Sequence, residues 1–363
     1  MTRLRLVGDI AANREIADPP GSALPLLGDS DLTIANLECP LTERGTPAPK
    51  PSVLRGPVAL AQQLRDLGVN ACSLANNHAL DYGADGLTDT FAALAGAGAA
   101  WAGAGRDLAS AAAPTFLTSQ DGRQVALISV ACTVPPGFRA TDDSPGVAGL
   151  TVNEIYHTVP GLDVEQPGTV PFVATSVDPT ESSLLLDEVR AARSEADLVL
   201  VAVHWGVAWA YRPPNQGPLA EYQVPLGRAL VDAGADVVIG HHSHALDPIE
   251  WWGSGLILYG TGNFLFHPDP PGTIQLGSPG LARYRPILES GPWFDSAVFD
   301  VEIVAGRRTE LRVIPVVLNA DGDPELAEEP DRDRILESIV TSSRLFHPHL
   351  SSDPSGRLLP ALV

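Results

Sequence analysis

Side chains of types that bind metal ions follow several short apolar runs in this chain of 363 residues. Asp9 follows the run LRLVG, Glu38 follows TIANL, and the triplet NNH occupies positions 76–78 after a third run. Further along, His204 ends the run DLVLVAVH, and HHSH at positions 241–244 follows ADVVIG. Within HHSH, two neutral imidazoles separated by one small residue can both turn toward one cation. The pattern therefore predicts a metal site.

The ligand types restrict the metal. Carboxylate, amide and imidazole ligands without a thiolate suit divalent ions such as Mn, Fe, Zn, Mg or Ca, and imidazoles favour the transition metals. These ligands exceed what one ion needs, so we expect two ions, roughly 3.5 to 4 Å apart and bridged by a carboxylate. Each residue taken alone has a structural alternative, with Asp9 as a turn or capping residue, Glu38 as a surface carboxylate and His204 as a core histidine.

The apolar runs that precede these residues are short and rich in β-branched side chains, as buried strands are. We expect strands at 4–8, 31–38, 69–75, 124–131, 197–204, 235–240 and 255–260. Helical spacing occurs at 56–68, 83–98, 181–196 and 217–234, and we expect a hairpin over 298–319 and a closing helix at 330–346. Alternating strands and helices predict a layered α/β fold, in which ligands bind at the carboxyl ends of the strands.

Two long segments interrupt this alternation. Residues 133–180 and 267–295 are rich in Pro, Gly, Asp and Ser, and at this length we expect functional loops or lids. No internal repeat or linker divides the chain, so we expect one domain over residues 1–350 and a surface tail over residues 351–363.

Composition narrows the class of protein. A net charge of −21 argues against nucleic acid and anionic membranes as partners. Cys39, Cys72 and Cys132 are few and widely spaced, so we interpret them as reduced core thiols. The N-terminus has no leader pattern, and no apolar window reaches the ~18 residues that a membrane span requires. We therefore expect a cytoplasmic location.

Several motifs together resemble the CapA family, which is named for a poly-γ-glutamate capsule biosynthesis protein and belongs to the calcineurin-like metallophosphoesterase superfamily. They are GDI (8–10), NLECPLT (36–42), SLANNHALDYGADGLTDT (73–90), GAG (103–105), HWG (204–206), DAGADVVIGHHSHAL (232–246) and YGTGNFLF (259–266). The resemblance implies a four-layer α/β/β/α sandwich, the calcineurin-like metallophosphoesterase fold, with two metal ions at the strand ends. It implies the metal ligands Asp9, Glu38, Asn77, His204, His242 and His244.

By the same resemblance, His78 handles protons beside the metals, and Asp81 either orients it or caps a helix. Members of the superfamily usually carry Asp-x-His on the first strand, but this chain has Ala11 in place of the histidine. In the CapA pattern a Glu-Tyr pair usually follows HWG, and here the residues are Ala208 and Trp209.

The CapA-like set includes lasso-peptide epimerases, and their chemistry suits these residues. A divalent ion can stabilise the charge formed when a Cα proton leaves, and a neutral imidazole can take that proton. We therefore expect a metal-dependent peptide epimerase without an organic cofactor. For the second proton carrier we consider His267, Asp269 and Asp295. The tryptophans near the metal-bearing loops favour a peptide with an aromatic residue near its C-terminus.

Two other functions stay open. One is metal-dependent hydrolysis of a phosphoester or phosphodiester. The other is a poly-γ-glutamate-related role or a non-catalytic peptide-binding protein that keeps the fold.

Overall fold

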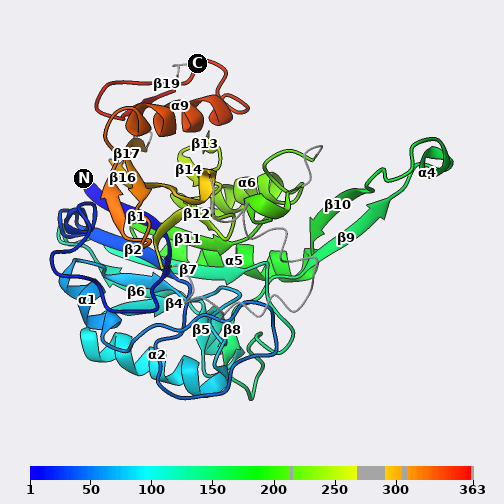
Figure 1. Ribbon diagram of the computed structural model, residues 1–363. Coiled ribbons are helices and arrows are strands. Elements are labelled where there is room, and N and C mark those ends of the chain that lie inside the picture. Colours follow the sequence, from blue (N-terminus) through cyan, green and yellow to red (C-terminus); the bar gives the residue numbers. More distant parts are fainter. Residues whose placement is uncertain (213–215, 268–290, 305–308, 361–363) are drawn as a thin grey trace.

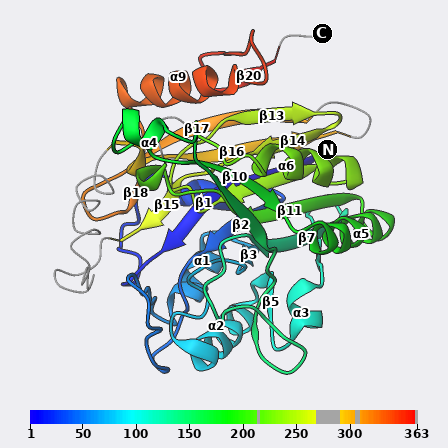
Figure 2. The same ribbon diagram turned by 90° about the vertical axis from the view of Figure 1, so that its right-hand side faces the viewer.

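The computed structural model describes residues 1–212, 216–267, 291–304 and 309–360, and two facing β-sheets form its centre (Figures 1 and 2). The first sheet contains, in spatial order, β18 (Pro324–Leu326), β17 (Glu310–Leu318), β16 (Asp295–Ile303), β1 (Thr2–Ala11), β2 (Leu32–Leu37), β3 (Ala71–Ser73) and β4 (Ala100–Ala102), and β15 (Asn263–Phe266) also pairs with β1. The second contains β13 (Ile249–Trp252), β14 (Gly255–Leu258), β12 (Val237–His241), β11 (Leu198–His204), β7 (Gln124–Ala131) and β6 (Thr115–Thr118).

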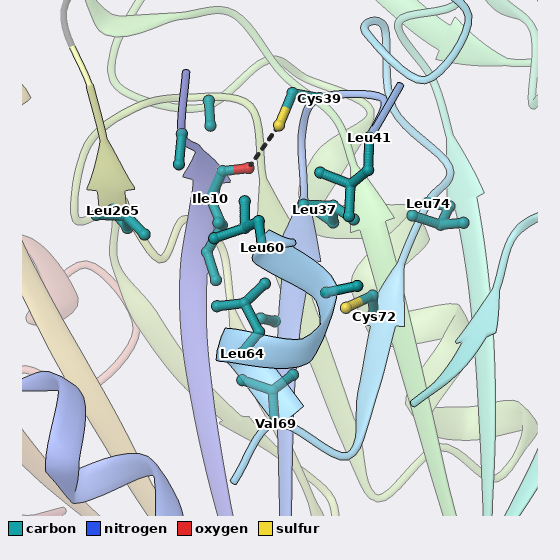
Figure 3. Packing of buried hydrophobic residues seen from close by; sticks show 14 of the residues in the cluster. Ile10, Leu37, Cys39, Leu41, Leu60, Leu64, Val69, Cys72, Leu74 and Leu265 are labelled. Carbon is teal, nitrogen blue, oxygen red and sulfur yellow. Dashed lines mark hydrogen bonds between the residues drawn. The ribbon is translucent and has the colours of Figure 1, made fainter. Parts of the chain in front are cut away.

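Three apolar cores bind the layers together. Between the sheets lie side chains such as Leu6, Ile34, Leu200 and Val237, which are at most 1% exposed. Helices α1 (Leu60–Asp66) and α2 (Gly83–Ala97) cover the outer face of the first sheet, and Figure 3 shows this packing around Leu60, Leu64, Leu37 and Ile10. Helices α5 (Pro179–Glu195) and α6 (Gln223–Ala233) cover the outer face of the second sheet.

This arrangement confirms the four-layer α/β/β/α sandwich. Strands lie at each of the seven segments where we expected them, because every apolar run is buried on both faces. The hairpin of β16 with β17 and the closing helix α9 (Asp331–Ser343) are also present, and α9 packs its apolar face on the core between the sheets. Cys39 and Cys72 are free thiols in the interior, and Cys132 is a partly buried free thiol.

The segment 133–180 is not a simple loop. It contains β9 (Val152–His157) and β10 (Phe172–Val177), which form a two-stranded hairpin joined through α4 (Leu162–Glu165) and projecting from the body (Figure 1). Tyr156 and Val164 on this hairpin are 62% and 79% exposed. Of the segment 267–295, residues 268–290 lie outside the described part of the chain.

At the C-terminal end, we expected a tail over residues 351–363. The structure shows β19 (Ser351–Ser352) paired with β20 (Leu358–Leu359), and the side chain of Leu358 is buried. Residues 361–363 lie outside the described part. None of the described helices combines the length and apolar character that crossing a membrane needs.

Candidate metal centre

The first strand brings Asp9 to the edge where the parallel strands of both sheets end. Asp9 lies at an irregularity in β1, where the pairing registers with β2 and β15 both shift. Gly8 allows this geometry, because a Cβ there would lie 2.0 Å from the main-chain oxygen of Gly262. The main-chain N–H of Asp9 donates to that same oxygen at 3.0 Å. Such bulges often aim a side chain next to a functional site.

Two groups of side chains at this edge have the geometry to hold metal ions. One consists of Glu38, His204 and His242, and the other of Asp9, Glu38 and His244. Within each group the ligand atoms lie within 4.8 Å of one another. Glu38 is common to both groups, so it occupies the place of a bridging carboxylate.

Asp9 is held by hydrogen bonds from both sheets. The side-chain amide of Asn36 donates to Oδ1 at 2.8 Å, and the main-chain N–H of His242 donates to Oδ2 at 3.3 Å. Asn76 in turn donates to the Oδ1 of Asn36 at 3.2 Å. Burial acts to raise the pKa of Asp9, but the contact with His244 and the other nearby imidazoles outweighs it and lowers that pKa. Asp9 is thus a preoriented, ionised ligand.

Glu38 is fully buried, and among the described residues neither of its oxygens accepts a hydrogen bond. Burial and the nearby charge of Asp9 raise its pKa well above the ordinary value. A buried carboxylate without a donor is costly unless a cation compensates it. The unsatisfied oxygens of Glu38 therefore fit a divalent cation.

Burial keeps the imidazoles of His204 and His242 in the neutral form. Burial lowers the pKa of His204 well below its usual range and that of His242 to about 3. The Nε2 of His204 lies 2.8 Å from the Oδ1 of Asn77, whereas the Nδ1 of His242 has no hydrogen-bond partner among the described residues. The Nδ1 of His244 lies 2.8 Å from the Oδ1 of Asn263. Neutral imidazole nitrogens are the form that binds metal.

The HHSH loop carries backbone strain at two of these histidines. His242 has a φ of 85° and His244 a φ of 51°, and they are the only non-glycine residues with positive φ in the described part of the chain. Left-handed backbone is unfavourable for histidine, and such outliers concentrate at functional sites. The strain turns two rings separated by one residue toward different ligand groups.

His78, Asp81 and Lys50 form a hydrogen-bonded cluster beside these groups. His78 Nδ1 lies 2.6 Å from Asp81 Oδ2, and Lys50 Nζ lies 2.5 Å from Asp81 Oδ1. Burial lowers the pKa of His78 and that of Lys50, although Asp81 acts in the opposite direction on both. Nδ1 of His78 is committed to Asp81, so Nε2 is the ring nitrogen left for proton transfer.

All eight residues that the sequence predicts as metal ligands or proton carriers lie at one edge of the sheets. Asp9, Glu38, His204, His242 and His244 form the two ligand groups, Asn77 bonds to His204, and His78 bonds to Asp81. His241 is the last residue of β12 and belongs to neither group.

Sequence reasoning missed Asn36 and Lys50, whereas the position of Asn263 after the apolar run LILYGTG marks it as a potential ligand. Asn36 and Asn263 are the cross-strand neighbours of Asp9 on its two sides. The signal for Lys50 was available, because it is the single lysine of the chain.

The residues considered as second proton carriers lie in other surroundings. Asp295 makes a two-pronged ion pair with Arg334 at 2.5 and 2.7 Å. His267 bonds to Asp323 at 3.0 Å. Asp269 lies outside the described residues.

An aromatic wall flanks one ligand group. The ring of Trp293 lies 4.8 Å from that of His244, and Phe266 packs edge-on against both. The main-chain oxygen of Trp293 accepts a hydrogen bond from Asn263 at 3.1 Å, which ties the wall to the partner of His244. Other tryptophans near the predicted motifs pack in the body of the protein, namely Trp205, Trp251 and Trp252.

A four-layer sandwich with carboxylates, an amide and imidazoles at the shared strand edge defines the metallophosphoesterase-like class. Within it, the chain belongs to the family described as bacterial capsule synthesis protein PGA_cap, whose profile matches residues 3–268. This confirms the CapA resemblance.

Several curated relatives are similar in sequence. A probable polyglutamine synthesis accessory protein of Mycobacterium tuberculosis is 36% identical over 251 residues, which is 68% of this chain and 58% of that protein. The PGA biosynthesis protein CapA of Bacillus subtilis is 29% identical over 67% of this chain and 55% of its own length. The capsule biosynthesis protein CapA of Bacillus anthracis is 30% identical over 93% of this chain and 72% of its own length. The chain thus spans a little over half the length of the first two.

Proposed function

We propose that the chain is a divalent-metal-dependent enzyme that processes a glutamyl polymer of the poly-γ-glutamate type. The observation that carries the proposal is the position of Glu38, a buried carboxylate without hydrogen-bond donors that belongs to both ligand groups. Support for the polymer comes from the names of the relatives, which concern polyglutamine synthesis, PGA biosynthesis and capsule biosynthesis.

The charge of the protein determines what an anionic substrate would need in order to bind. An anionic polymer meets a protein with a net charge of −21, so it needs local positive charge to bind. Lys50 and Arg212 are each paired with a buried aspartate, Asp81 and Asp247. The divalent ions would therefore supply the positive charge that a substrate carboxylate needs.

The residues at this edge have separable roles. Asp9, Glu38, Asn77, His204, His242 and His244 would hold two ions. When bound, these ions polarise a substrate carboxylate or amide oxygen. His78 receives or donates the proton at Nε2, because Asp81 holds Nδ1 at 2.6 Å. The aromatic wall of Phe266 and Trp293 lies on the side of His244.

Incubation of the metal-loaded protein with poly-γ-glutamate oligomers in D2O tests the proposal. We expect metal-dependent binding, together with a change in chain length or deuterium at Cα, both read by mass spectrometry. Glu38→Gln should abolish binding and turnover together. Metal-dependent binding without any covalent change would instead identify a non-catalytic polymer-binding protein. Absence of binding with every divalent ion would refute the polymer as the substrate.

Cα epimerisation of a residue in a ribosomal peptide, including a lasso-type precursor, is a second candidate. It is favoured by the aromatic wall, which suits an aromatic peptide residue beside the His244 ligand group. The relatives' names mention no such peptide. Uptake of one deuterium with inverted configuration in an aromatic peptide, and none in the glutamyl oligomers, would select this candidate.

Phosphoester hydrolysis is less favoured by the sequence of the first strand. Ala11 stands where phosphoesterases of the superfamily usually carry a histidine, so one of their usual metal ligands is missing here. Turnover of a chromogenic phosphodiester by the metal-loaded protein, without reaction of either peptide substrate, would select hydrolysis instead.

A further inference from the structure

The segment 205–212, which follows β11, is bonded at two points to the loop that carries the HHSH motif. The main-chain N–H of Trp209 donates to the main-chain oxygen of Ser243 at 2.9 Å. Two nitrogens of the Arg212 guanidinium donate to the two carboxylate oxygens of Asp247, at 2.8 and 2.9 Å. Ser243 lies inside the motif, and Asp247 lies three residues after its end. The segments that follow β11 and β12 are therefore joined to each other.

The ion pair of Arg212 with Asp247 has a fixed geometry. The two side chains are 15% and 2% exposed. Nε of the guanidinium donates to the main-chain oxygen of Val207 at 2.9 Å, and the main-chain N–H of Asp247 donates to the main-chain oxygen of Gly260 at 3.1 Å. A two-pronged pair of this kind adds geometric specificity to the attraction between the charges. Each partner is thus held by its own surroundings as well as by the other.

The HHSH loop needs such support from neighbouring segments. The positive φ of His242 and His244 is unfavourable for residues other than glycine, and it persists only where the surrounding structure determines it. The Nδ1 atom of His242 has no hydrogen-bond partner among the described residues, so this nitrogen does not hold the ring. The bonds from Trp209 and Arg212 reach the main chain of the loop and the residue just beyond the motif. They restrict the backbone from which both ligand rings extend.

We propose that Arg212 and Asp247 are positioning residues, whose ion pair holds the HHSH loop in the conformation in which His242 and His244 bind metal. This inference rests on the proposed function only for the divalent ions, and it is independent of the polymer. The conformation of the loop is also a property of the metal-free protein, so it can be measured without any ion.

The charges of the pair and its geometry predict different effects on metal affinity. Charge alone would make Arg212→Met bind a divalent cation more tightly, because a repelling positive charge is removed, and Asp247→Asn more weakly. Loss of positioning weakens metal binding in both variants, because either substitution removes the two-pronged pair. The direction of the change in Arg212→Met therefore distinguishes a positioning role from an electrostatic one.

Calorimetric titration of the full chain with Mn2+ measures this direction. We expect the Kd to rise about 10- to 100-fold in both variants, as for other outer partners of metal ligands. Arg212→Lys keeps the charge but cannot form the two-pronged pair, so it should also raise the Kd, and it serves if Arg212→Met does not fold. In EDTA, hydrogen–deuterium exchange of residues 241–246 should be faster in each variant than in wild type.

Arg228→Met is the matched control. Arg228 also donates two nitrogens to a buried carboxylate, that of Glu250 in β13. Its loss should lower stability and leave both the Kd and the exchange of residues 241–246 unchanged.

Two results would overturn the proposal. One is a lower or unchanged Kd in Arg212→Met, and the other is exchange of residues 241–246 at the wild-type rate in both Arg212 variants. Metal binding without any reaction of the glutamyl polymer would refute only the proposed substrate. If wild type binds no divalent ion, the proposed function fails, whereas exchange in EDTA still tests whether the pair holds the loop.

Discussion

The two sheets bring different ligands to the same edge and hold them by different means. The first sheet supplies the carboxylates Asp9 and Glu38, and the second supplies the imidazoles of His204, His242 and His244. Hydrogen bonds from neighbouring segments of the chain orient Asp9, whereas His242 and His244 are oriented by a backbone with positive φ. Hydrogen bonds order a ligand without metal, but strained backbone must be stabilised by its surroundings. Glu38 is the exception on the carboxylate side, since only cations would satisfy it.

Glu38→Gln is expected to have the largest effect. Removal of the shared carboxylate should weaken both ions by more than the roughly 100-fold that loss of an outer partner costs. The stabilisation by metal, about 2.7 kcal/mol at a concentration 100 times the Kd, should then disappear. Calorimetric titration with Mn2+ and thermal unfolding with and without the ion measure both effects.

Glu250→Gln is the matched control for this variant. Glu250 is equally buried, but Arg228 and Tyr259 satisfy its oxygens. The substitution should destabilise the fold and leave the Kd for Mn2+ unchanged. An unaltered Kd in Glu38→Gln would show that the two ligand groups do not share this residue.

Asn36→Ala tests whether hydrogen bonds orient the ligand Asp9. Loss of the 2.8 Å bond to Asp9 should raise the Kd for metal by about 10- to 100-fold, as for other outer partners. Asn70→Ala removes a similar bond, to the main-chain N–H of Thr33 at 2.7 Å, farther from the ligand groups along β2. It should leave the Kd unchanged. Equal affinities in Asn36→Ala and wild type would mean that packing alone orients Asp9.

The pH dependence of stability separates Glu38 from the other groups. Its pKa is raised in the folded protein, first by burial and then by Asp9. Stability from the bound proton is therefore complete below the unfolded value of about 4.3 and is lost as the pH rises through the folded value. Without metal, wild type should lose stability relative to Glu38→Gln by up to about 1.4 kcal/mol per pH unit between the unfolded and the folded pKa of Glu38, and no further above the folded value. Guanidinium unfolding in EDTA at several pH values measures the difference, and a pH-independent difference contradicts the raised pKa.

The sequence predicted that these side chains lie together because each of them ends or follows a buried strand. Parallel neighbouring strands end at one edge, so Asp9 and Glu38 had to meet once their strands were identified, whereas His204 reaches them from the second sheet through the packing of the two sheets. The division of His242 and His244 between two groups was predictable only through the family resemblance. Their positive φ depends on the loop around them, and no pattern of residue types shows it.

Contacts between distant segments were beyond sequence reasoning. Lys50 and Asp81 are thirty-one residues apart in the sequence. No periodicity indicates that residues 48–54 contact the segment just before helix α2. The hairpin of β9 and β10 was missed for another reason, because its exposed strands lack a buried face and composition alone resembles a loop.

The smallest predicted effect tests the backbone strain in the HHSH loop. The difference in stability between the glycine and the alanine variant should have opposite signs at two histidines. At φ 85°, His242→Gly relieves the backbone, so metal-free His242→Gly should be more stable than His242→Ala by about 1 kcal/mol. His204 lies in regular β11, where His204→Gly should be less stable than His204→Ala by roughly 0.5 to 1 kcal/mol. Urea unfolding of the four variants in EDTA measures both differences. The same sign at both positions would show that the HHSH backbone is not strained.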